Sequence, residues 1–255
     1  MRSFPVRVTG GISLSEWIEN LKTQFDLNFI QKDRWKYLWD GLGNTLRITL
    51  FACLIGIAIG TLIAIVRSTS DRVLPTMRKG VGRVLLTILD KFCRIYLTVI
   101  RGTPAVIQLM ICYYVIFASS RNGILIATIS FGLNSAAYVA EIVRGGIMSV
   151  DNGQFEAGRS LGFNYVQTMW LIIIPQALKT VLPSLANEFI VLLKETSVAG
   201  YVAVKDLTKG GDIIRGVTYS PFMPLIAVAL IYLVLVVFFS WLVGKLERRL
   251  RNSDH

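Results

Sequence analysis

The sequence is poor in the residues that most often carry the chemistry of soluble enzymes. Its single histidine is His255 at the C-terminus, which excludes a histidine-based triad or a histidine-ligated metal site inside the chain. The three cysteines, Cys53, Cys93 and Cys112, lie far apart and have no neighbouring cluster of ligands. We therefore expect the cysteines to act as small apolar residues, and we expect no metal site.

Nucleotide-binding and catalytic patterns are missing as well. No G-x-x-x-x-G-K-[ST] phosphate loop occurs, because the glycine pairs at 145–146 and 210–211 lack the Lys-Ser or Lys-Thr that completes it. Apart from the adjacent Lys194 and Glu195, no cluster of catalytic groups is visible. The prediction is that this chain is not itself an enzyme.

Charged residues are scarce, whereas apolar residues are abundant. Of the 255 residues, 53% are hydrophobic and 17% are charged, and the mean hydropathy is +0.57. The net charge of +11 does not indicate nucleic-acid binding, because the basic residues lie between long apolar runs, as in the loops of membrane proteins. The composition predicts an integral membrane protein in contact with lipid.

Long apolar segments locate the spans. Four stretches without a charged residue approach or exceed the roughly 20 residues that a helix needs to cross a bilayer. A fifth segment contains Glu188, Lys194 and Glu195, and we count it as a span because of the charge distribution described next. The predicted spans are 48–66, 102–120, 122–140, 181–199 and 216–244.

Basic residues predict the topology. They follow the first span at 67–83 and the last span at 245–251, so both regions are assigned to the cytoplasm. An odd number of spans with the N-terminus outside also places 144–179 in the cytoplasm. The prediction is an all-α polytopic membrane protein with five transmembrane helices and a cytoplasmic C-terminus.

An extension at 1–40 precedes the spanning domain, which we assign to 41–255. The extension lacks the compact apolar region of a signal peptide, so we expect it to remain on the mature chain. Its aromatic residues, among them Trp17, Trp35 and Trp39, favour a helix at the membrane interface. A solvent-exposed tail is an equally open alternative.

The region before the second span is irregular. Asp90 and Arg94 lie within 85–100, which we interpret as an approach helix near the cytoplasmic face. Pro104 removes a backbone donor and disfavours a helical conformation in the residue before it. A break in the helix is therefore expected at this proline.

The segment at 154–183 carries the most specific pattern. The residues from Glu156 to Leu161 suit a short helix, Gly162 permits a left-handed end, and Pro175 is expected to break the apolar helix that follows. A short charged helix held outside the membrane can occupy a groove of a soluble partner. An amphipathic helix with a plain interfacial role is the alternative.

This segment resembles the cytoplasmic loop of the membrane subunits of bacterial ABC importers, which has the form E-A-A-x3-G-x9-I-x-L-P. The sequence has Glu156, Ala157, Gly162 and Pro175 at that spacing, with glycine in place of the second alanine and isoleucine in place of the leucine. Further motifs resemble the polar amino acid branch of that family. They are Asn-Thr-Leu at 44–46, Arg-Gly-Thr-Pro at 101–104, Asn-Ser-Ala-Ala-Tyr at 134–138 with Glu141, Arg-Gly-Gly-Ile at 144–147 and Leu-Leu-Lys-Glu-Thr-Ser at 192–197.

The resemblance implies a type I ABC importer permease fold in the bacterial plasma (inner) membrane. It implies two ATP-binding subunits that hold ATP and Mg, a second permease subunit that is identical or homologous, and an extracellular or periplasmic amino acid-binding protein. This chain would bind no cofactor. The coupling loop would span about 145–180. The residues implied in ATPase docking are Glu156, Ala157, Gly158, Arg159, Ser160, Leu161 and Gly162.

Polar side chains inside the spans are candidates for substrate binding. A charge in the middle of a span costs about 2.5–3.5 kcal/mol, so such groups normally face a cavity or a partner. Lys194 and Glu195 point about 100° apart on a helix, so one could meet a carboxylate and the other a cationic group of an amino acid. The predicted substrate-binding residues are Lys194, Glu195, Thr196, Ser197, Asn134 and Gln108.

Several alternatives stay open from the sequence. The charged pair could form an ion pair between helices, and Asn134 or Gln108 could form an interhelical hydrogen bond. Glu188 is expected at a solvated helix start, with a gate or an ion pair to Arg144 as the alternative. An ion-coupled secondary transporter or channel would fit the break at Pro104, although it leaves the loop at 154–183 unexplained. The residues do not decide which amino acid is transported.

Overall fold

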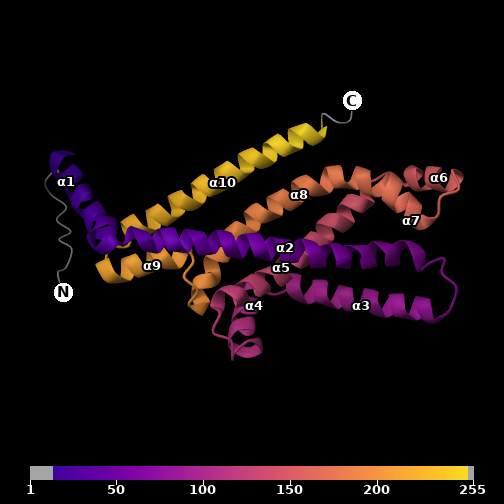
Figure 1. Ribbon diagram of the computed structural model, residues 1–255, viewed down its shortest axis with the longest axis horizontal. Helices are drawn as coiled ribbons and strands as arrows, with labels where there is room; N and C mark the ends of the chain where they lie inside the picture. The colour runs from indigo at the N-terminus through magenta and orange to yellow at the C-terminus, as the bar shows by residue number, and fades with distance from the viewer. Residues whose placement is uncertain (1–13, 252–255) are drawn as a thin grey trace.

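The computed structural model describes residues 14–251, which are helical over nearly their whole length and include no β-strand (Figure 1). The expected all-α fold is confirmed. Four helical runs are long and apolar enough to cross a membrane, and a bent pair of helices makes a fifth if it is counted as one span. The four are α2 (Trp35–Val73), α5 (Gly123–Met148), the run Tyr165–Val202 that contains α8 (Ile174–Glu195), and α10 (Phe222–Arg251).

Small residues bring α2 and α5 together at the centre of the fold. Cβ atoms added at Gly60 would lie 2.7 Å from the carbonyl oxygen of Ala136 and from the side chain of Val139. In lipid, helices associate largely through such close packing, because the hydrocarbon is as apolar as the side chains. Both helices carry a stripe of small residues at four-residue spacing, Ala52, Gly56, Gly60 and Ala64 on α2 and Gly132, Ala136 and Ala140 on α5.

A second close approach joins α9 (Leu207–Thr218) to the start of α2. A Cβ atom at Gly41 would lie 2.5 Å from the carbonyl oxygen of Asp206, so only glycine fits there. The Asp206 carboxylate caps α9 by accepting hydrogen bonds from the backbone amides of Thr208 and Lys209. Burial raises the pKa of the Asp206 carboxyl above its usual range.

The N-terminal helix α1 (Leu14–Phe25) and the π-helical turn Asp26–Ile30 after it form hydrogen bonds with the connection between α9 and α10. Asn28 is fully buried, and its Oδ1 accepts a hydrogen bond of 2.8 Å from Thr218 Oγ1. Ser220 Oγ donates to Gln24 Oε1 at 3.0 Å. Figure 1 shows α1 steeply inclined to α2 at the end of the molecule opposite α6. The interfacial location stays a prediction, and residues 1–13 of the extension lie outside the described part of the chain.

The second predicted span differs from the structure. α3 (Val81–Arg101) and α4 (Ala105–Ile111), which continues as a π-helical turn, meet at 107°. The helical part of the predicted span at 102–120 covers only 105–116, and it counts as a span only together with α3. The expected break at Pro104 is confirmed. The helix predicted at 85–100 is confirmed as part of α3, which is longer, with 21 residues, and runs along α2 (Figure 1).

Two charged residues of α3, Asp90 and Arg94, form ion pairs. The buried Asp90 pairs with Arg67 of α2, and its second oxygen accepts from Arg94 at 2.8 Å. Hydropathy treats these charges as exposed, whereas the fold pairs them, which explains how a helix rejected as a span can pack along one. The whole network joins α2, α3 and α5 through Arg67, Asp71, Asp90, Arg94, Arg101, Glu141 and Arg144.

The last span begins later than predicted. Tyr219 adopts a left-handed conformation with φ of 54° and ends α9, and α10 begins at Phe222 rather than at 216. The predicted span at 48–66 lies within α2, and the one at 122–140 lies within α5 except for its N-cap Asn122. The one at 181–199 lies within the run Tyr165–Val202.

Candidate functional site

The short helix predicted after the third span is present as α6 (Asn152–Ser160). Asp151 begins it, because its carboxylate accepts a hydrogen bond of 2.6 Å from the backbone amide of Gly153. Gly162 ends it with φ of 81°, while the amide of Phe163 donates to the carbonyl oxygen of Gly158 at 3.0 Å. This is a left-handed helix end of the Schellman type, as the glycine predicted.

The two faces of α6 differ sharply. Phe155 and Gly158 are buried against the rest of the protein. Leu161, just after the helix, is 70% exposed and adds an apolar side chain to the outer face. The predicted docking residues that are exposed are Glu156, Ala157, Arg159, Ser160, Leu161 and Gly162, so Gly158 alone of that set faces inward.

The inward position of Gly158 explains why glycine replaces the second alanine of the motif. A Cβ atom there would lie 2.7 Å from Cγ2 and 2.8 Å from Oγ1 of Thr168. Thr168 is buried at the end of α7 (Tyr165–Thr168), a turn that begins with a capping box between Asn164 and Gln167. The threonine side chain therefore fills the space that an alanine methyl would occupy.

This contact gives a testable pair of substitutions. Gly158→Ala is expected to lower the stability of the folded chain by about 1–3 kcal/mol, because the new methyl group overpacks against Thr168. Gly158→Ala combined with Thr168→Ala should recover most of that loss. Thermal unfolding of the purified protein in detergent measures both, with Gly145→Ala, where a Cβ meets nothing within 4 Å, as the control. A double variant no more stable than Gly158→Ala would contradict this explanation.

Pro175 does not break the helix that follows, contrary to the prediction. The chain stays helical through a π-helical turn at Met169–Ile173 and enters α8 with the proline in its first turn. Proline is tolerated there because its missing amide proton is not needed, and the wide π turn absorbs the mismatch. The region 145–180 therefore consists of the end of α5, then α6 and α7, and the start of α8.

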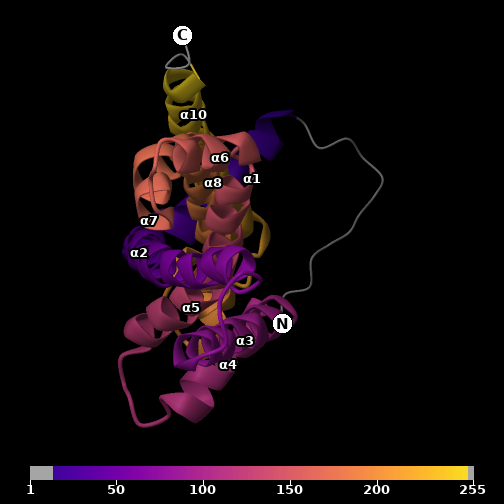
Figure 2. The ribbon, with the colours of Figure 1, turned by 90° about the vertical axis from the view of Figure 1, so that its right-hand side faces the viewer.

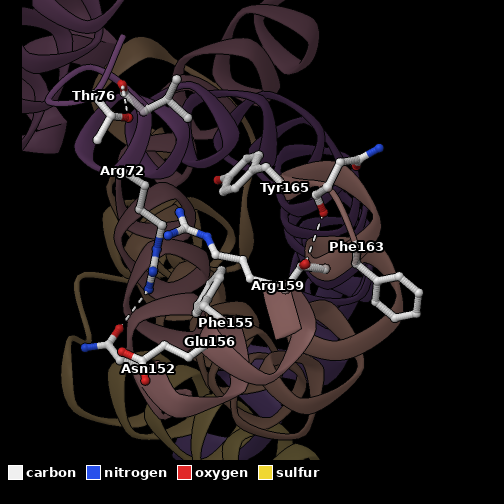
Figure 3. Close-up of a pocket in the computed structure, with 11 residues that line it drawn as sticks. Arg72, Thr76, Asn152, Phe155, Glu156, Arg159, Phe163 and Tyr165 are labelled. Atoms are coloured by element: carbon white, nitrogen blue, oxygen red, sulfur yellow. Dashed lines mark hydrogen bonds between the residues drawn. The ribbon is translucent and has the colours of Figure 1, made fainter. Parts of the chain in front are cut away.

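A cavity of about 630 Å³ lies between the C-terminal end of α2 and the helices α6 and α7 (Figure 3). Arg72 enters it from α2. Its guanidinium lies 3.5 Å from the ring centroid of Phe155 and donates to Asn152 Oδ1 at 3.3 Å. The Tyr165 hydroxyl is buried and has no hydrogen-bond partner among residues 14–251. The exposed face of α6 and this cavity together form the candidate coupling site.

Two of the predicted substrate-binding residues are in contact. Asn134 is 3% exposed, and its Nδ2 donates to Gln108 Oε1 at 2.9 Å. Gln108 Nε2 donates to the carbonyl oxygens of Ile100 and Thr103 at 2.7 Å and 3.0 Å. These carbonyls lie at the break between α3 and α4, so the amide satisfies backbone groups that the bend would leave open. Within the described chain, the buried Asn134 Oδ1 has no partner.

The other four predicted residues lie at the end of α8 and in the 3₁₀ turn after it. Lys194 is exposed and Glu195 is half-buried. Neither side chain forms an ion pair or a hydrogen bond over residues 14–251, so the ion pair considered from the sequence is not seen. Thr196 is fully buried and its hydroxyl donates to the carbonyl oxygen of Leu193, whereas Ser197 is half-buried.

Glu188 is the residue whose place the sequence misjudged. It lies in the middle of α8 rather than at a solvated start, and its Oε1 accepts a hydrogen bond of 2.9 Å from Ser135 Oγ of α5. Arg144 pairs with Asp71 and Glu141 instead. The signal that was available is spacing, because Glu188 and Glu195 are seven positions apart and share one face of a helix.

Comparison with known proteins decides the family. Residues 80–252 match the family described as "Binding-protein-dependent transport system inner membrane component". The chain belongs to this family. The expected resemblance is confirmed, and the multi-span helical fold is that of a transport permease.

Relatives within this permease family are named for the transport of several amino acids. The putative glutamine transport system permease of Rickettsia bellii is 35% identical over 84% of this chain and 93% of its own length. The arginine transport system permease of Bacillus subtilis is 33% identical over 86% of this chain and 94% of its own length. The L-cystine transport system permease of Bacillus subtilis is 30% identical over 90% of this chain and 93% of its own length.

Solved structures of permeases have the same fold. A crystal structure described as an amino acid ABC transporter with histidines matches with a TM-score of 0.73 and 35% identity, covering 94% of this chain and all of that one. An inward-facing methionine ABC transporter matches with a TM-score of 0.71 at 19% identity, covering 86% of this chain and 98% of that one. The type I ABC importer permease fold expected from the sequence is therefore confirmed.

Proposed function

We propose that this chain is the membrane-spanning permease subunit of an ABC importer that moves polar amino acids into the cell. The observation that carries the proposal is the exposed α6, a capped helix with a free outer face, in a chain whose family match covers residues 80–252. Two ATP-binding subunits would dock on this face and would hold ATP and Mg. The other partners are a second permease subunit, identical or homologous, and an extracellular or periplasmic amino acid-binding protein.

The proposed location is the bacterial inner membrane, with α6 and the end of α10 on the cytoplasmic side. Basic residues support this orientation, because Arg72 contacts α6, Arg159 lies within α6 and Arg248 lies near the end of α10. The N-terminus would then be outside. Residues 252–255, which include His255, lie outside the described part of the chain.

For the substrate, we propose a site between α5 and α8. Glu188 and Glu195 point to one side of α8, and Lys194 is the cation whose charge acts on Glu195 within residues 14–251. Asn134 offers an unpaired carbonyl oxygen on α5. Two carboxylates in one span with a single lysine beside them favour a ligand with positively charged groups, which every amino acid ammonium provides and a cationic side chain would extend.

The test is ATP hydrolysis by the complete transporter in liposomes, stimulated by each of the twenty amino acids with the binding protein present. We expect stimulation by a polar subset, and we expect Glu195→Gln to reduce uptake of the best substrate about tenfold by removing a charged contact. Glu247→Gln, on the exposed side of α10, is the matched control. Uptake that is insensitive to ATP depletion, or a chain that purifies without an ATPase, would instead indicate the ion-coupled alternative.

A further inference from the structure

α2 is much longer than a bilayer requires. Its 39 residues extend about 58 Å at 1.5 Å per residue, whereas the hydrocarbon core is about 30 Å thick. The apolar part of the helix ends at Val66, so its last two turns project past the span toward α6. Figure 2 views this end of the molecule, with α6 and α7 on one side of α2 and α3 on the other. The projection brings α2 within reach of the coupling site.

Arg72 makes the contact between the two elements. Its guanidinium stacks 3.5 Å from the centroid of the Phe155 ring and donates to Asn152, so a single side chain contacts both ends of the first turn of α6 (Figure 3). Phe155 is 8% exposed and belongs to the buried cluster with Ile147 and Ile173. A guanidinium over a buried aromatic face is a strong form of cation–π contact.

Two other side-chain contacts of α6 are with α7 and α8 rather than with α2. Gly158 packs against Thr168 of α7, and Gln154 accepts a hydrogen bond of 3.3 Å from Gln176 of α8. Over residues 14–251, Arg72 is the side chain of α2 that forms a hydrogen bond or ring contact with α6. Without it, a displacement of α6 would reach α2 only indirectly, through α5 and α8.

Motion of α2 matters because α2 contacts the substrate side of the fold. A Cβ atom at Gly56 would lie 2.9 Å from the Ser135 hydroxyl, the same group that donates to Glu188. A rigid displacement of α2 therefore shifts the wall against which Ser135 and Glu188 rest. Closely packed helices transmit such shifts because the side chains between them leave no empty space into which one helix could move alone.

We propose that Arg72 is a positioning residue that joins the coupling helix to α2, so that ATP-driven displacement of α6 moves α2 together with α5 and α8. The inference rests on the proposed function. Neither Arg72 nor Phe155 belongs to the motif that indicated the family, so the link is a feature of this chain's own side chains. It makes α2 an active part of the transport movement.

The experiment uses the complete transporter in proteoliposomes, with uptake of a mixture of the twenty radiolabelled amino acids and ATP hydrolysis measured in parallel. Arg72→Ala is expected to lower uptake about tenfold while ATP hydrolysis continues, so the ATP consumed per transported molecule rises about tenfold. Phe155→Leu should do the same, and Phe155→Trp should retain coupling because it keeps an aromatic face. Arg78→Ala, an exposed arginine of the following loop, is the matched control.

The double variant decides whether the two residues act through their contact. The uptake rate of Arg72→Ala combined with Phe155→Leu should be no lower than that of either single variant, because each single variant already removes the whole interaction. Effects that multiply, uptake equal to that of Arg78→Ala, or a loss of uptake in proportion to lost ATPase assembly would each overturn the positioning role. A wild-type complex without ATP-driven uptake would contradict the proposed function itself, which is a separate outcome.

Discussion

Gly60→Leu is expected to destroy the central helix pair of this protein. A Cβ atom at Gly60 would already lie 2.7 Å from a backbone oxygen of α5, and leucine adds three further carbons. Because Ala136 contributes backbone rather than a flexible side chain, α2 and α5 must separate along their whole contact. We expect a loss of at least about 3 kcal/mol, enough to leave little folded protein in detergent.

The measurement is the yield of monodisperse protein on size exclusion, together with the midpoint of thermal unfolding. Gly43→Leu is the matched control, because it lies on the same helix and a Cβ there meets nothing within 4 Å. Both variants add the same apolar volume, so membrane insertion should be equal. A Gly60→Leu protein as stable as Gly43→Leu would show that the small-residue stripe does not determine the packing of α2.

Gly162→Val is expected to abolish ATP-driven uptake without preventing insertion or folding of the spans. The residue adopts φ of 81°, a region that β-branched residues avoid at a cost of about 1–2 kcal/mol or more. A Cβ there meets nothing within 4 Å, so the effect comes from backbone conformation alone. Valine would unwind the end of α6 and move Leu161 away from its exposed position.

The readouts are uptake and the co-purification of the ATPase subunit. Gly162→Asn is the control, because asparagine tolerates the left-handed conformation and should retain most of the activity. Glu156→Lys provides an independent disruption of the same face by reversing its charge, and it should also abolish uptake. Normal transport by Gly162→Val and Glu156→Lys would mean that α6 is not where ATP energy enters.

The parts of the fold that the sequence predicted are those determined by local signals. Apolar runs predicted α2 and α5, and Gly162 predicted the end of α6, because hydropathy and a left-handed glycine act within a few residues. The sequence predicted the helix within α3 but did not count it as part of a span, because the charge of Asp90 is neutralised by a residue on another helix. The pairing of Asp90 with Arg67 spans 23 positions, and no window of sequence shows it.

The candidate site likewise contains features that local sequence predicts and features that depend on distant residues. The position of Lys194 and Glu195 in a span followed from their place in an apolar segment. The role of Glu188 did not, because it depends on the Ser135 hydroxyl, which lies 53 positions away. The substitution of glycine for alanine at Gly158 looked conservative in sequence, whereas the structure shows that it compensates for the bulk of Thr168.

The bend between α3 and α4 restricts which positions can change when a permease of this fold evolves a new substrate specificity. Backbone carbonyls exposed by a kink inside a membrane need donors, and the Gln108 amide supplies them at Ile100 and Thr103. A substitution at this position would therefore change the shape of the helix before it changed any recognition. Natural diversification of selectivity should accordingly accumulate at α8 and spare Gln108, so that related permeases can differ in substrate while their bent helix pair stays the same.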